Sequence, residues 1–296
     1  MDSETLNNYI LAGKIAAQVR DYGKSLIKEG SSVLEILDNV EKKISELNAK
    51  PAFPAQISLN ETAAHFCPEE NDKTILTDQL VSLDIGVHIN GCIGDTAITI
   101  DLSGKYSDLI KASDKALENA LKIIHTGISL GEIGMEIEDT IKSFGFNPVR
   151  NLSGHGLGIY SIHKKPTIPN YNTKDKTILE EDQIIAVEPF STIGFGMIQE
   201  KGLPTIFTLG RNFSSRVDFV RKIIKEIESY KGLPFTTRWL TKKFSKQQAA
   251  YALAELMRNE CLIDHPPLVE ISGGFVSQSE HTIIVGEKTR ILTEFE

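Results

Sequence analysis

Apolar side chains recur at helical spacing in several stretches of the chain. Residues 3–29 keep apolar positions three or four residues apart and are followed by Gly30, which predicts a first helix. Ser32 and Glu35 form a capping-box pattern before a second run of this kind, so we expect a helix from residue 33 to 47. The same spacing predicts helices at 107–125, 132–145, 212–230 and about 245–261.

Other stretches carry the alternation and the turn residues of strands. Residues 79–101 read as two strands about Asn90-Gly91, a strong signal for a two-residue hairpin. The run 183–190 reads as a short buried strand, and residues 273–286 read as a closing strand. Because helices and strands alternate only loosely and the strongest strand pair is a hairpin, we expect an α+β fold.

The predicted hairpin carries a carboxylate on each arm. If Asn90-Gly91 form the turn, Asp84 faces Ala97, and Asp95 becomes its diagonal neighbour on the same face. Two ionised carboxylates so close repel one another unless a cation lies between them or one takes up a proton. A shared hard divalent metal resolves this conflict. Two solvated charges remain the alternative, and a turn shifted by one residue would put the aspartates on opposite faces.

Composition narrows the class of protein. The chain has 296 residues, a net charge of -8 and three cysteines without CxxC spacing. These values suit a soluble protein of a reducing compartment, and we expect the cytoplasm. The negative charge disfavours DNA and anionic membranes as partners. We identify no signal peptide and no apolar stretch long enough to span a bilayer.

Three further polar residues are candidate ligands. His155 lies between glycines, where backbone can approach a site closely, although a loop histidine is commonly just exposed. Glu188 ends an apolar run, so it needs a metal or an ion-pair partner. Glu280 shares a predicted strand face with polar neighbours and could equally be solvated. His88 shares a face with Asp84 by alternation, and spacing alone would admit it as a ligand.

Five segments together resemble a known family. In chain order they are "PAFPAQISLNETAAHFCP", "LDIGVHINGCIGDTAITI", "LSGHGLGIYSIHKKPTIPN", "IIAVEPFSTIGFG" and "SQSEHTII". They are similar to the metal-site segments of type 2 methionine aminopeptidases, which are pita-bread (creatinase/aminopeptidase) metallopeptidases. The chain resembles the archaeal form, since it lacks a long charged N-terminal extension.

The resemblance implies a set of site residues. The metal ligands would be Asp84, Asp95, His155, Glu188 and Glu280. They would hold two divalent metal ions. Because this ligand set is rich in oxygen donors, it does not select among cobalt, manganese, iron(II) and zinc. Glu188, His163 and His65 would be catalytic, and His65, His163 and Phe53 would contact substrate, whereas His88 would not be a ligand.

It also implies an activity and an organisation. A hydroxide bridging the two metals would remove the N-terminal methionine from peptides and nascent chains whose second residue is small. Residues 1–191 and 272–296 would form the pita-bread catalytic domain, and 192–271 the inserted helical subdomain of type 2 enzymes. We expect a monomer with at most a transient ribosome contact. Two alternatives share the fold: a non-catalytic RNA- or ribosome-associated protein, and an Xaa-Pro aminopeptidase.

Overall fold

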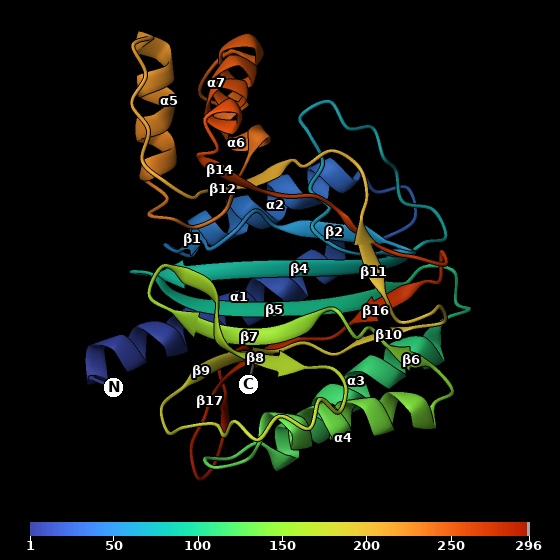
Figure 1. Cartoon of the computed structure of the whole chain (residues 1–296). Helices are drawn as coiled ribbons and strands as arrows, with labels where there is room; N and C mark the ends of the chain where they lie inside the picture. Colours follow the sequence, from blue (N-terminus) through green and yellow to red (C-terminus); the bar gives the residue numbers. More distant parts are fainter. Residues whose placement is uncertain (295–296) are drawn as a thin grey trace.

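The computed structural model describes residues 1–294, in which helices cover antiparallel sheets on two sides (Figure 1). On one side the helices are α1 (Ser3–Leu26) and α2 (Val33–Glu46), and on the other α3 (Ser107–Ile123) and α4 (Leu130–Ser143). Their apolar stripes form two separate cores: α1 and α2 pack on the four-stranded sheet, and α3 and α4 pack on the five-stranded sheet. The helices and antiparallel sheets confirm the α+β class expected from the sequence.

The strands of the two larger sheets carry the candidate ligands or directly adjoin them. The four-stranded sheet has the order β1-β4-β2, with β5 paired to β4, and the five-stranded sheet has the order β18-β17-β9-β7-β8. Their bounds are β1 Lys50–Pro51, β2 Gln56–Leu59, β4 Leu80–Ile89, β5 Cys92–Asp101, β7 Ser153–Gly158, β8 Ser161–Pro169, β9 Ile184–Val187, β17 His281–Ile284 and β18 Arg290–Ile291.

Three smaller sheets complete the architecture. Their orders are β16-β10-β6, β11-β15-β3 and β13-β12-β14. The strands are β3 Thr62–Ala64, β6 Asn147–Pro148, β10 Phe190–Thr192, β11 Ile198–Glu200, β12 Ile206–Leu209, β13 Phe235–Thr236, β14 Leu262–His265, β15 Leu268–Glu270 and β16 Val276–Gln278.

A helical unit stands above the sheets in Figure 1. It contains α5 (Asp218–Glu228), α6 (Thr237–Thr241) and α7 (Lys246–Arg258), with β12, β13 and β14 beneath them. Its apolar residues, from Phe207 to Cys261, form a core of their own. Arg238 on α6 is buried and forms ion pairs with Glu41 and Asp38 on α2, which joins this unit to the body.

Two predicted elements differ from the structure. Of the helix expected at 212–230, only α5 forms. Before it, the Ser215 hydroxyl accepts from the backbone N–H of Val217, a local bond that competes with the helix, and donates to Glu255 on α7. The strand expected at 273–286 is split into β16 and β17. At the break, the backbone N–H of Ser279 donates to Pro189 and that of Glu280 donates to Ala97, so the chain changes sheets there.

Candidate metal centre

The hairpin of β4 and β5 brings two carboxylates to one face. Asn90 and Gly91 have φ values of 51° and 91°, as a type I′ turn requires at both central positions. Asp84 pairs with Ala97 and Gly86 pairs with Asp95, without interruption of the ladder. The register inferred from the sequence is therefore confirmed, and the aspartates are diagonal neighbours.

Segments from the other sheets deliver the remaining candidates. His155 lies in β7, which pairs with β9, and Glu188 directly follows β9. Glu280 lies between β16 and β17, where its backbone bond to Ala97 brings it to the hairpin. The Thr282 hydroxyl accepts from the Asp95 N–H and donates to the Asp95 carbonyl, both at 2.8 Å, and so fixes β17 against β5.

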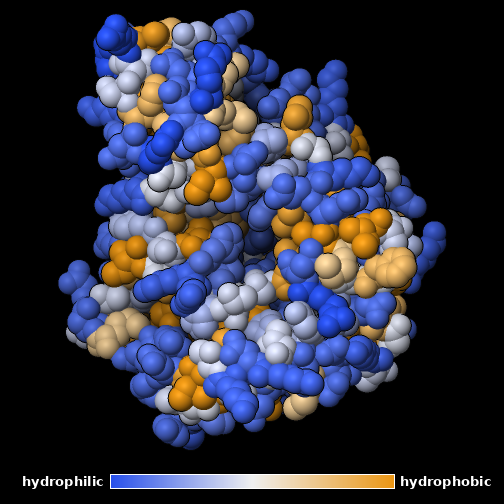
Figure 2. All heavy atoms as spheres, viewed as in Figure 1, coloured by the Kyte–Doolittle hydropathy of each residue, from blue (hydrophilic) through white to orange (hydrophobic). Residues whose placement is uncertain are grey.

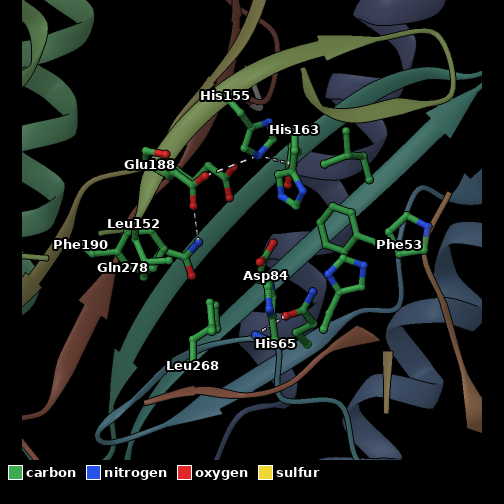
Figure 3. Close-up of a pocket in the computed structure, with 18 of the residues that line it drawn as sticks. Phe53, His65, Asp84, Leu152, His155, His163, Glu188, Phe190, Leu268 and Gln278 are labelled. Atoms are coloured by element: carbon green, nitrogen blue, oxygen red, sulfur yellow. Dashed lines mark hydrogen bonds and ion pairs between the residues drawn. The ribbon is translucent and has the colours of Figure 1, made fainter. Parts of the chain in front are cut away.

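These five side chains line one cavity of about 280 Å³. His155 Nε2 lies 3.5 Å from Glu188 Oε1 and 3.8 Å from Asp95 Oδ2. Ligand atoms of Asp95, His155 and Glu280 all lie within 4.8 Å of one another. Figure 3 shows His155, Glu188 and Asp84 converging from different strands, with His163 beside them. In the space-filling view the same face is hollowed near its centre (Figure 2).

The carboxylates of this cavity resist ionisation when no cation is present. Burial raises the pKa of Asp84 to about 7. Burial, and then repulsion from neighbouring carboxylates, raises the pKa of Asp95, Glu188 and Glu280 well above the usual range. The only Lys or Arg among the described residues lining the cavity is Lys164, which is largely exposed. The protein therefore supplies little positive charge of its own to this group.

The donor set suits divalent metal ions. Asp84 Oδ1 and Asp95 Oδ1 are shielded from solvent and have no hydrogen-bond partner among the described residues. Buried acceptors of this kind are costly unless something binds them. Burial lowers the pKa of His155 to about 3, so its imidazole is neutral, as a metal ligand must be. Four carboxylates and one neutral imidazole match the donors that hard and borderline divalent ions prefer.

The two accessory histidines stand beside this cluster. His65 and His163 both line the cavity, and both have left-handed backbone with φ of 63° and 56°. Such strain in a non-glycine residue is characteristic of functional sites. His163 packs edge-on against His155, with 4.6 Å between the ring centroids. Burial lowers the pKa of His65 to about 4, and partial desolvation followed by repulsion from His265 lowers the pKa of His163, so the neutral form of both rings is favoured.

Phe53 forms an apolar wall of the cavity. Its ring lies against Gly86 of β4, where an added Cβ would stand only 2.7 Å from Phe53 Cζ. Glycine at this position therefore makes room for the ring between the two ligand-bearing positions of the hairpin. Ile162, Ile206 and Leu268 line the same cavity.

Sequence reasoning did not single out His265. This residue lines the cavity, and its Nε2 shares a hydrogen bond of 2.9 Å with the Thr208 hydroxyl. Its ring packs edge-on against the His65 ring, with 5.6 Å between the ring centroids. No local pattern in the sequence marks His265 as a site residue, because β14 reaches the site only through its pairing with β12. His88, by contrast, lines a different cavity.

Comparisons with known proteins agree with this site. A family model described as metallopeptidase family M24 matches residues 7–287. The chain belongs to this family. A methionine aminopeptidase of Archaeoglobus fulgidus is 44% identical over 295 residues, which cover 99% of each chain. One from Methanocaldococcus jannaschii is 40% identical over 289 residues, which cover 97% of each chain. The resemblance found from the five motifs is thus confirmed.

Solved structures share the fold of this chain, which confirms the pita-bread fold expected from the sequence. A methionine aminopeptidase from Thermotoga maritima has a TM-score of 0.73 at 23% identity, covering 99% of this chain and 98% of that one. A thermophilic Arx1 has a TM-score of 0.85 at 16% identity, covering 99% and 91%. At these identities the likeness concerns the fold alone. As a family M24 metallopeptidase with a buried Asp/His/Glu cluster, the chain has the donors for divalent metal binding. Among residues 1–294, no helix has the length and apolar character to cross a membrane.

Proposed function

We propose that this chain is a methionine aminopeptidase, which removes the N-terminal methionine from peptides and nascent proteins with a small second residue. The observation that carries the proposal is the convergence of four carboxylates and a neutral imidazole in one cavity that has little positive charge of its own. The archaeal relatives with this name cover nearly the whole chain, and this supports methionine release over a binding role or cleavage before proline.

The ligands of two divalent ions would be Asp84, Asp95, His155, Glu188 and Glu280. Ligand atoms of Asp95, His155 and Glu280 lie within 4.8 Å of one another, which supports a shared site for these three residues. Cobalt, manganese, iron(II) and zinc all suit these donors. When bound, such ions lower the pKa of water to near 7, polarise the peptide carbonyl and accept a free amine.

The chain's own residues would then position the peptide and move protons. Glu188 lies beside His155 and is suited to carry a proton from water to the leaving amine. His163 and His65 are neutral, and each can donate one N–H, which suits the developing oxyanion and the scissile amide respectively. Phe53, enclosed against Gly86, would form one wall of an apolar slot for the methionine side chain.

The organisation expected from the sequence completes the proposal. Residues 1–191 and 272–296 would be the catalytic domain, with 192–271 inserted; the separate core of this insertion, from Phe207 to Cys261, supports an independent unit. We place the enzyme in the cytoplasm as a monomer that contacts the ribosome transiently, which fits a substrate that emerges during synthesis.

Methionine release from defined peptides tests the proposal. Metal-stripped protein should release methionine from Met-Ala-Ser only after cobalt, manganese, iron(II) or zinc is added. N-acetyl-Met-Ala-Ser should be inert, because its amine is blocked, and Glu188→Ala should be inactive. Cleavage of Ala-Pro-Ser but not Met-Ala-Ser would instead identify an Xaa-Pro aminopeptidase. Folded protein that releases nothing with any of the metals would contradict catalysis and favour a binding role.

A further inference from the structure

A second cavity lies where the helical unit meets the body. Its volume is about 400 Å³, and it is bounded by β1 and β4 on one side and by the end of α5 and by α6 on the other. It shares only Pro234 with the metal cavity. Sites for small molecules are commonly found between structural units and have this size.

Two lysines that have no carboxylate partner in the described part of the chain line this cavity. Lys50 pairs in register with His88, and Lys231 lies over the Tyr160 ring at 4.4 Å and donates to its hydroxyl at 3.1 Å. The other two lysines at the cavity are already paired, Lys242 with Asp38 and Lys243 with Glu226. Within residues 1–294, Lys50 and Lys231 therefore remain as uncompensated positive charges.

A buried imidazole adds a third donor between these lysines. His88 Nδ1 accepts from the Gly91 N–H at 3.1 Å, so in the neutral ring the proton is on Nε2. Burial, followed by the charges of Lys50 and Lys231, lowers the pKa of His88 to about 4 and keeps the ring neutral. The nitrogen that His88 can offer to the cavity is thus a hydrogen-bond donor.

The backbone holds one of these donors in a strained position. Lys231 has a φ of 55°, and Gly232 after it has a φ of 88°. This left-handed pair lies in the turn after α5, and Lys231 donates there to Tyr160 of the β7–β8 turn. A non-glycine residue held in this region is costly and is often found where a ligand is bound.

Most of the remaining cavity wall is aromatic or apolar, and its one carboxylate, Glu226, already accepts from Lys243 and from the Tyr230 hydroxyl. Tyr160, Tyr230, Trp239 and Leu233 line it, together with Pro51. A bare inorganic anion would occupy only a small part of the 400 Å³. A planar ring would fill the remaining space, since aromatic side chains pack well on flat ligands.

We propose that this cavity binds a small organic phosphate with a planar ring, such as a nucleoside monophosphate, whose phosphate is held by Lys50, Lys231 and the His88 N–H. Lysine ammonium groups are suited to phosphate, and a neutral imidazole N–H adds direction. This site is independent of the proposed peptidase activity, because it shares none of the candidate metal ligands.

The protein carries a probe for this site. Trp239 is the single tryptophan of the chain and lines the cavity, so a bound ligand should change its fluorescence. We would titrate intact metal-free protein with AMP, adenosine and inorganic phosphate, and follow both tryptophan fluorescence and binding heat. AMP should bind, phosphate should compete with it more weakly, and adenosine should bind at least tenfold more weakly than AMP.

Variants localise the binding. Lys50→Ala/Lys231→Ala should weaken AMP binding at least tenfold, and both positions are exposed, so the fold should persist. Lys176→Ala, at an exposed lysine away from the cavity, is the matched control and should leave binding unchanged. No AMP binding at millimolar concentration, equal affinity in the double variant, or equal affinity for adenosine would overturn the proposal. If inorganic phosphate bound as tightly as AMP, the proposed role of the ring would be contradicted. Binding of long polyanions alone would indicate a nucleic-acid surface instead.

Discussion

Asp84→Asn should stabilise the metal-free protein at high pH, although it removes a proposed metal ligand. Burial raises the pKa of Asp84 from 3.8 to about 7 in the folded state. Between these two pH values the folded protein keeps a proton that the unfolded chain has released, so the free energy of unfolding falls as pH rises. At about 1.4 kcal/mol per pH unit, the ionised aspartate costs the metal-free fold about 4 kcal/mol at pH 8. An amide at this position carries no such cost.

Urea unfolding of chelator-treated protein measures this difference. Asp84→Asn should exceed the wild type in stability by up to about 4 kcal/mol at pH 8, with the gain shrinking toward zero near pH 4. At equal pH the contributions of the buried histidines largely cancel. Loss of the Asp84 charge also eases the ionisation of Asp95, Glu188 and Glu280, which shifts the stability in the same direction. Added metal should reverse the order, since it stabilises only a complete site. A metal-free variant less stable than wild type at pH 8, or a difference independent of pH, would refute the reasoning.

Three further substitutions test other parts of the structure. Gly86→Ala should displace the Phe53 ring and raise KM for Met-Ala-Ser at least tenfold, and an unchanged KM would argue against a slot at Phe53. Arg238→Met should cost roughly 3–5 kcal/mol in urea unfolding, because it leaves the buried Glu41 with only Lys242, 4.0 Å away, as a cation. Adding Glu41→Gln should recover part of this loss, and no recovery would contradict the pairing. His163→Ala should lower kcat by roughly 10²-fold or more, while the metal affinity measured by calorimetry stays the same. A loss of metal binding in this variant would show that His163 is a metal ligand instead.

Local chemistry in the sequence determined the hairpin and its register. Asn-Gly is one of the few pairs that accept positive φ at both turn positions, so the turn at Asn90-Gly91 and the pairing of Asp84 with Ala97 followed from it. The helices α1 to α4 likewise followed from apolar spacing and caps, with ends within a few residues of those expected. The resemblance in five motifs added the order of the candidate ligands.

Long-range pairing decided what local patterns left open. Glu280 has polar neighbours and suited an exposed strand face equally well, yet it is 2% exposed, because its backbone N–H bonds to Ala97 and brings it to the hairpin. His265 joins His65 through a strand pairing that no spacing reveals, and His88, which alternation placed with Asp84, lines the second cavity instead. Residue types and local periodicity thus determined which groups this protein has available. Only contacts between residues far apart in the sequence determined which of those groups meet, because such contacts depend on how the sheets and the helical unit pack.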